Sequence, residues 1–205
     1  MNTKIHILFI ATIIAYSFVA LKNVLIAIVV LTTVLSIDLL RLKTSKKVVE
    51  LIRKKVALDI RGAVTPLTTS ALMALWSFQN IDYPSLLFLI SLAIALSSLN
   101  TIVTSKFFAI NILGYVMPYF ILATILYGDT EFYPYILPLS VQLGVIIGSD
   151  VLHGIYFTNE MRSKMLIIGG AGEHDAIYVS TIAIEWLEMF YKSLTTLICL
   201  TKSVY

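Results

Sequence analysis

The chain has 205 residues, of which 59% are apolar and 13% charged; its mean hydropathy is +0.91 and its formal net charge +3. This composition lies outside the range of soluble globular proteins. It predicts an all-α protein of the cell membrane, a single domain of residues 1–205 built as a polytopic bundle of transmembrane helices.

Seven apolar segments follow one another along the chain, separated by short polar or charged breaks. Such segments are long enough to cross a hydrocarbon core about 30 Å thick. We expect spans at 5–21, 24–40, 62–78, 85–103, 107–127, 135–157 and 165–191. A cleaved signal peptide is the competing interpretation of residues 1–21, but no small-x-small cleavage site follows and the apolar pattern resumes at once.

The basic residues predict the orientation. With seven spans, twelve of the fifteen Lys and Arg residues share one side: Lys4, eight residues from Arg41 to Arg61, Lys106, Arg162 and Lys164. The positive-inside rule then places the N-terminus in the cytoplasm and the C-terminus outside. Cys199 is the single cysteine in the sequence, so no intrachain disulfide can form.

Residues 41–61 are the one substantial polar segment. Val48, Val49, Ile52 and Val56 recur at helical spacing with lysines and arginines between them, which predicts a short basic amphipathic helix at the headgroup boundary. This basic cytoplasmic loop would set the topology by meeting anionic inner-leaflet lipids, or alternatively serve regulation by such lipids or a partner. No nucleic-acid, phosphate-loop or zinc motif occurs, and we expect no cofactor and no metal.

Ionisable residues within two neighbouring spans form the candidate site. In the sixth span Asp150 is followed by His153 and Gly154, all on one helical face, and Asp175 lies in the seventh. Because only residues 158–164 join these antiparallel spans, both carboxyls are expected at a similar depth near the cytoplasmic side. A charge inside a span costs at least about 2.5–3.5 kcal/mol and usually marks a site.

Three glycines precede Asp175 in the stretch "GGAGEHDAI". Gly169, Gly170 and Gly172 predict an interrupted or irregular seventh helix, with a new half-helix that begins near Glu173. Its free N–H groups would face a substrate or ion pocket that contains His153, Glu173 and His174 beside the two aspartates. In the alternative, Asp150 and Asp175 only cap or cross-link two helices, and His153 is a hydrogen-bond donor.

Three other acidic residues are interpreted without a functional role. Asp38 lies in the last turn of the second span and is expected at the membrane interface. Glu185 and Glu188 are expected to make outer-leaflet or inter-helix contacts, since Glu188 can pair with Lys192 at i+4.

Three short stretches carry a family resemblance. "RGAVTP" (61–66), "GSDVLHG" (148–154) and "GGAGEHDAI" (169–177) are similar to the motifs Gly-Gly-Ala-x-x-Pro, Gly-Ala-Asp-Leu-Leu and Gly-Gly-Ala-Gly-x-x-Asp-Gly-Ile. The chain thus resembles domain-of-unknown-function family 1614, prokaryotic multi-pass membrane proteins. Arg61, Ser149 and Ala176 depart from the family residues Gly, Ala and Gly. The family has no established activity, so the resemblance bears on the fold and the location of the site.

Three functions remain open from the sequence. Asp150 and Asp175 resemble the catalytic pair of presenilin-like intramembrane aspartyl hydrolases, although Glu173 and His174 separate Asp175 from the glycines and no Pro-Ala-Leu stretch occurs. Such enzymes activate water with two carboxyls that share a proton. The alternatives are a proton- or cation-coupled carrier of small solutes and a structural or assembly protein. The sequence indicates neither a substrate nor an oligomeric state.

Overall fold

The computed structural model describes residues 3–44, 48–52, 56–103, 108–157, 166–170 and 175–202. Within these ranges the chain forms seven helices, which confirms the all-α class and the number of helical segments. They are α1 (Thr3–Val19), α2 (Val24–Thr44), π-helix η1 (Ile60–Val64) continued by α3 (Thr65–Trp76), α4 (Tyr83–Leu99), α5 (Ile112–Tyr127), α6 (Tyr133–Leu143) continued by π-helix η3 (Gly144–Val151) and α7 (Leu152–Phe157), and α8 (Ala176–Lys202). A single 3₁₀ turn, η2 (Phe78–Asn80), lies between α3 and α4.

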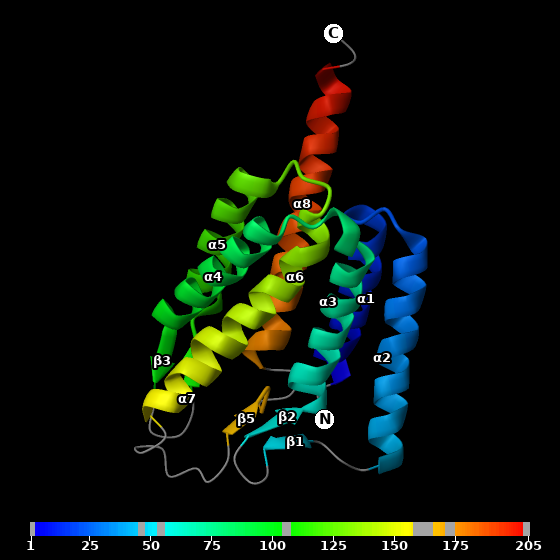
Figure 1. Ribbon diagram of the computed structural model, residues 1–205. Helices are drawn as coiled ribbons and strands as arrows, with labels where there is room; N and C mark the ends of the chain where they lie inside the picture. Colours follow the sequence, from blue (N-terminus) through cyan, green and yellow to red (C-terminus); the bar gives the residue numbers. More distant parts are fainter. Residues whose placement is uncertain are drawn as a thin grey trace.

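Short strands lie at one end of the bundle (Figure 1). β1 (Val48–Ile52) pairs antiparallel with β2 (Val56–Asp59), and β2 pairs parallel with β5 (Leu166–Ile168). A separate hairpin joins β3 (Thr101–Val103) and β4 (Phe108–Ile110). The amphipathic helix expected within 41–61 is therefore wrong: residues 48–52 pair as a strand with 56–59, and 56–58 pair in turn with 166–168, about 110 residues away in sequence.

The segment around the glycines also differs from the prediction. Residues 166–168 are a strand rather than the start of the seventh helix, and α8 begins at Ala176 and runs to Lys202. Gly169 follows the strand with φ +76°, a left-handed conformation that favours glycine. A continuous helix through residues 166–191 is thus excluded, and the last helix begins after the glycines, as expected.

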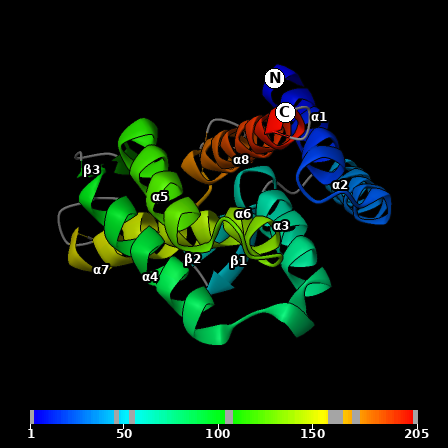
Figure 2. The same ribbon diagram turned by 90° about the horizontal axis from the view of Figure 1, so that it is seen from above.

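The helices alternate in direction, so the chain begins at the sheet end and α8 ends beyond the opposite end (Figure 1). Seen from above, α6 and α8 lie between the α1–α2 pair and the α4–α5 pair (Figure 2). One apolar core gathers on α4, α5 and α6, and a second on α1 and α2. Tyr178, Ile182 and Met189 of α8 belong to the second core.

Among the described residues, one continuous helical stretch, Tyr133–Gly154, is long and apolar enough to cross a membrane by itself. Four further apolar helices have 10–17 residues: Lys4–Val19, Val24–Leu40, Tyr83–Leu99 and Ile112–Tyr127. At 1.5 Å per residue, a 17-residue helix extends about 25 Å.

Close packing of η3 against α4 depends on small residues. Ser97 donates from Oγ to the carbonyl oxygen of Gly144 at 2.5 Å. A Cβ atom added at Gly148 would overlap the Ser97 side chain and the backbone oxygen of Ile94. The two helices can approach this closely because residue 148 has no side chain.

We expect Gly148→Ala to destabilise the bundle by about 1–3 kcal/mol, because the α4 backbone would have to move away. Thermal unfolding of the purified protein in detergent measures this as a lower Tm. Gly170→Ala is the matched control, since Gly170 is exposed and its added Cβ would meet nothing closer than 3.0 Å. Equal melting temperatures for the two variants would contradict the close approach of η3 and α4.

Candidate functional site

The predicted site residues fall at the sheet end of the bundle (Figure 1). Asp150 lies in η3, His153 in α7, and Asp175 directly before α8. Gly169 and Gly170 form the turn after β5. The predictions for Gly172, Glu173 and His174 lie outside the described residues.

Asp175 forms the N-terminal cap of α8. Its Oδ1 accepts a hydrogen bond from the backbone N–H of Ile177 at 3.0 Å, and its carbonyl oxygen accepts from Val179 at 3.0 Å. A carboxylate at this position satisfies an orphan N–H group and complements the positive end of the helix dipole. Asp175 thus caps a helix, which is one of the two roles considered for it from the sequence.

Asp150 and Asp175 are near enough for their charges to interact. Asp150 is half-buried within the π-helical turn of η3, an irregularity that is frequent at functional sites. His153 turns back onto its own helix, with Nδ1 2.9 Å from the carbonyl oxygen of Gly148 and 3.2 Å from that of Ser149. The Nδ1–H therefore donates locally, and the ring also lies beside Phe108, with 6.0 Å between the ring centroids.

Segments distant in sequence meet at this end. The parallel pairing of β2 with β5 brings Gly169 against the backbone of Gly62 and Ala63, 2.7 Å from where the Gly169 Cβ would be. Asp59 caps η1 because its Oδ1 accepts from the N–H groups of Arg61 at 2.9 Å and Gly62 at 2.8 Å. The start of η1 and the turn at Gly169 thus form one structural unit.

A buried network beside this unit joins four helices. His6 Nε2 lies 2.5 Å from Oδ2 of Asp38, and His6 Nδ1 lies 2.6 Å from the Tyr178 hydroxyl. With a neutral ring, Nε2–H donates to the carboxylate and Nδ1 accepts from the tyrosine. The Arg61 Nε donates to the other oxygen of Asp38 at 3.3 Å. The sequence suggested only a location at the membrane interface for Asp38. In the structure its carboxylate also bridges α1 and η1.

A second buried network lies about one turn further along α8, at Thr181. Gln142 of α6 donates from Nε2 to Oγ of Ser70 at 2.6 Å and to Oγ1 of Thr181 at 2.8 Å. All three side chains are buried. They join α3, α6 and α8 within the apolar core.

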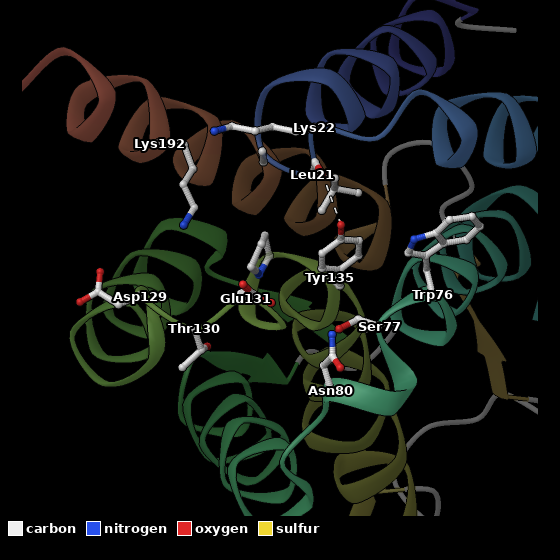
Figure 3. Close-up of a pocket in the computed structure, with 12 residues that line it drawn as sticks. Leu21, Lys22, Trp76, Ser77, Asn80, Asp129, Thr130, Glu131, Tyr135 and Lys192 are labelled. Atoms are coloured by element: carbon white, nitrogen blue, oxygen red, sulfur yellow. Dashed lines mark hydrogen bonds between the residues drawn. The ribbon is translucent and has the colours of Figure 1, made fainter. Parts of the chain in front are cut away.

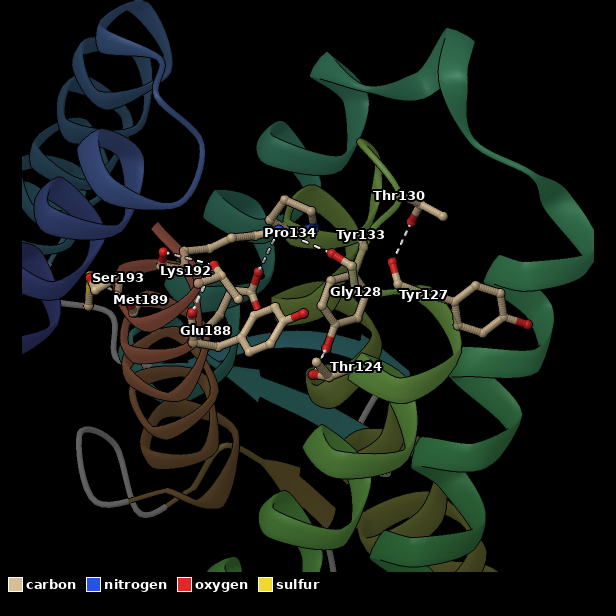
Figure 4. Close-up of polar contacts among 12 residues, drawn as sticks. Thr124, Tyr127, Gly128, Thr130, Tyr133, Pro134, Glu188, Met189, Lys192 and Ser193 are labelled. Atoms are coloured by element: carbon tan, nitrogen blue, oxygen red, sulfur yellow. Dashed lines mark hydrogen bonds and ion pairs between the residues drawn. The ribbon is translucent and has the colours of Figure 1, made fainter. Parts of the chain in front are cut away.

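A buried acidic pair lies further along α8. Glu185 is 1% exposed and Glu188 is fully buried. Lys192 Nζ lies 3.7 Å from Oε1 of Glu188, an ion pair beyond hydrogen-bond distance, and donates to the carbonyl oxygen of Gly128 at 3.1 Å (Figure 4). The expected pairing of Glu188 with Lys192 at i+4 is confirmed, and both glutamates are buried within the bundle, consistent with the expected inter-helix contacts.

These side chains define the polar face of α8. Its members recur at spacings of three and four residues on the buried side of the helix: Tyr178, Thr181, Glu185, Glu188 and Lys192. Fourteen residues separate the first from the last, which corresponds to about 21 Å along the helix. The polar face therefore extends from the sheet end toward the opposite end of the bundle.

At the opposite end, a pocket of about 570 Å³ opens among the helix connections (Figure 3). Its lining comes from residues 20–22, 76–80 and 129–135, and from Lys192. The polar face of α8 therefore reaches the pocket through Lys192.

The family model described as "Protein of unknown function (DUF1614)" matches residues 18–187. The chain belongs to the DUF1614 family. The matched range contains all three sequence motifs, which confirms the resemblance. No match was found among curated proteins or solved structures.

In the described part of this DUF1614 protein, no group of three or more His, Cys, Asp or Glu side chains is placed to hold a metal ion.

The roles of His6 and Asp38 could not be predicted from the sequence because their partners lie in three other segments. A signal for the polar face of α8 was present in the three- and four-residue spacing of residues 178, 181, 185, 188 and 192.

Asp38→Ala should lower stability by about 2–3 kcal/mol, because it removes the acceptor of charged hydrogen bonds in a largely buried site. Chemical or thermal unfolding in detergent tests this. Asp82→Ala provides the control: Asp82 caps α4 in an exposed turn, and loss of such a cap costs about 1 kcal/mol. An Asp38→Ala effect no larger than that of Asp82→Ala would show that the network contributes little.

Proposed function

We propose that this protein crosses the cell membrane seven times, with the N-terminus and the sheet end in the cytoplasm and the C-terminus outside. The apolar composition and the seven antiparallel helices support this arrangement. Twelve of the fifteen basic residues belong to the N-terminus and to connections at the sheet end. The basic residues of 41–61 would there contact anionic inner-leaflet lipids.

We further propose that the protein is a proton- or cation-coupled carrier of small solutes. The observation that carries this proposal is the polar face of α8, which places ionisable groups on the protein side of a helix from the sheet end to the pocket. Ionisable groups that face the interior of a transmembrane bundle mark ion and proton pathways. A lipid-facing or purely apolar α8 would not supply such a path.

A solely structural role explains part of this face but not all of it. The partners of Tyr178 and Thr181 satisfy their hydroxyl groups, as expected for polar side chains that fix helix packing. Glu185 and Glu188 differ, because carboxylate oxygens of both are buried without a hydrogen bond among the described residues. A buried carboxylate without partners is costly, and a bound positive charge would relieve that cost.

Asp150 and Asp175 form the inner ion site in this proposal, with His153 and the turn at Gly169 and Gly170 around it. Support comes from the interaction between the two charges and from the positive end of α8 beside Asp175. The same interaction is also required by an aspartyl hydrolase, in which two nearby carboxyls share a proton. A test of transport therefore includes a test of cleavage.

Topology is tested first with reporter fusions after Lys55 and after Tyr205. We expect a cytoplasmic signal at the first position and an external signal at the second. Signals from the same side would mean that an even number of crossings, rather than five, lies between the two positions, and the seven-span arrangement would be wrong.

Transport is tested with purified protein in liposomes that contain a pH-sensitive dye, with a potassium diffusion potential as the driving force. We expect proton entry well above that of empty liposomes, and a reduction of at least about tenfold for Asp150→Asn and for Asp175→Asn. Because both residues act in one site, the double variant should lose little more than either single variant. Asparagine also caps helices, so Asp175→Asn keeps the start of α8 intact.

The control is Asp82→Asn, an exposed cap at the other end of the bundle, which should transport like the original protein. Equal flux in all variants would exclude the two aspartates from the pathway. Cleavage of a membrane-spanning peptide by the same preparation, abolished by either substitution and without proton flux, would favour the hydrolase instead.

A further inference from the structure

The acidic pair of α8 lies next to the wall of the outer pocket. Lys192 lines this pocket and is the ion-pair partner of Glu188 (Figures 3 and 4). Pro134 lines it as well, and its carbonyl oxygen accepts a 2.6 Å hydrogen bond from the Tyr16 hydroxyl. Tyr16 in turn lies within reach of the charges of both glutamates. The pair is thus one side chain away from a space that opens to the outside of the bundle.

Both carboxyls have buried oxygen atoms without a hydrogen bond among the described residues. Glu185 Oε2 and both oxygens of Glu188 have no hydrogen bond among the described residues, although Glu185 is 1% exposed and Glu188 fully buried. Gln142 on α6 similarly keeps a buried Oε1 without a partner. Buried acceptors in native proteins are almost always satisfied, so unsatisfied ones call for a group that the protein chain does not itself provide.

The surrounding charges define what that group is. Titratable groups near the pair come from α1, α6 and α8: Tyr16, Tyr133, Tyr191 and Lys192. Lys192 is the cation of this set. Two ionised glutamates and one ammonium group leave one negative charge in excess, which one proton would neutralise.

A proton fits this site better than a metal ion. Hard cations such as Ca²⁺ take six or more oxygen ligands, and Mg²⁺ requires near-octahedral coordination. Two carboxylates beside a lysine ammonium group do not offer such a shell, and the described residues place no cluster of three acidic, histidine or cysteine side chains here. A proton needs only one carboxylate oxygen, so a single buried carboxyl can hold it.

We propose that Glu185 and Glu188 form a site for one exchangeable proton, loaded from the side of the membrane that carries the outer pocket. The site deepens the proposed carrier function, on which it rests for its role as the coupling site. Proton binding itself does not require transport, so the two proposals can fail separately.

Dicyclohexylcarbodiimide labelling tests the site, because this reagent attacks protonated carboxyl groups in apolar surroundings. The carboxyl oxygen bonds to the central carbon of the reagent while the carboxyl proton moves to one of its nitrogens. An acyl shift then gives a stable N-acylurea without a leaving group, which peptide mass spectrometry detects. We expect the label on Glu185 or Glu188, with the labelling rate falling about tenfold per pH unit above the midpoint of titration.

Three variants complete the labelling test. Glu185→Gln and Glu188→Gln should each abolish or strongly reduce modification at this site, whereas Asp82→Asn, at an exposed carboxylate, should leave it unchanged. A melting curve of each variant shows whether it has folded. If a glutamine variant does not fold, labelling of the unsubstituted protein at different pH values still shows whether Glu185 or Glu188 binds an exchangeable proton. No label on either glutamate at any pH, or a rate independent of pH, overturns the proposal.

Sidedness tests the route of loading. In sealed membrane vesicles of known orientation, only one face is brought to a new pH while the other is buffered. Labelling should follow the pH on the face that carries the pocket, as fixed by the reporter fusions. Labelling that follows the other face would contradict loading from the pocket. Sided, pH-dependent labelling without proton flux in liposomes would support the proton site and reject the carrier function. Proton flux without labelling would support the carrier function and reject the proton site.

Discussion

The structure depends on one constraint: polar groups that α8 buries against its neighbours must find their partners inside the protein, because apolar side chains surround them. Tyr178 meets His6 of α1, and Thr181 meets Gln142 of α6. A shift of α8 by one residue would rotate this face by about 100° and remove both contacts. The two networks therefore fix the register of α8 against α1 and α6, whereas apolar packing alone would tolerate several alignments.

The sheet adds a second restraint at one end. Because β2 and β5 run parallel, the helices that follow them, η1 with α3 and α8, both begin at the sheet end. Each start is capped by a carboxylate, Asp59 for η1 and Asp175 for α8. Two positive helix ends thus face the same region, where Asp150 interacts with Asp175. A backbone arrangement from distant segments, rather than an isolated pair of aspartates, creates the electrostatics of this end.

The sequence predicted the parts of the fold that local pattern determines. Seven apolar segments and their order follow from hydropathy alone, and the glycines before Asp175 indicated where the last helix would begin. The strands were missed because runs such as "VALD" become strands only through pairing with residues far away. The bounds of the last helix were predicted only in part: a helix from 165 to 191 puts Glu188 near its end, whereas α8 runs from 176 to 202 and puts Glu188 in its middle. Likewise, His6, Asp38 and Arg61 are unremarkable in sequence, and only the fold brings them together.

The two ends of the polar face differ in how their charges are balanced. At the sheet end, Asp38 has both His6 and Arg61 as partners, so its charge is held by the protein. Near the pocket, one ammonium group faces two carboxyls and is itself held by the carbonyl oxygen of Gly128. If a proton neutralises Glu188, its attraction to Lys192 is lost while the hydrogen bond from Lys192 to Gly128 remains. The Lys192 side chain can then move together with the connection between α5 and α6. Since that connection lines the pocket, the charge state of the pair and the shape of the pocket are linked through a single side chain. Such a link, in which occupancy of one site biases the conformation of another, is the physical requirement for coupling proton binding to the uptake of a solute.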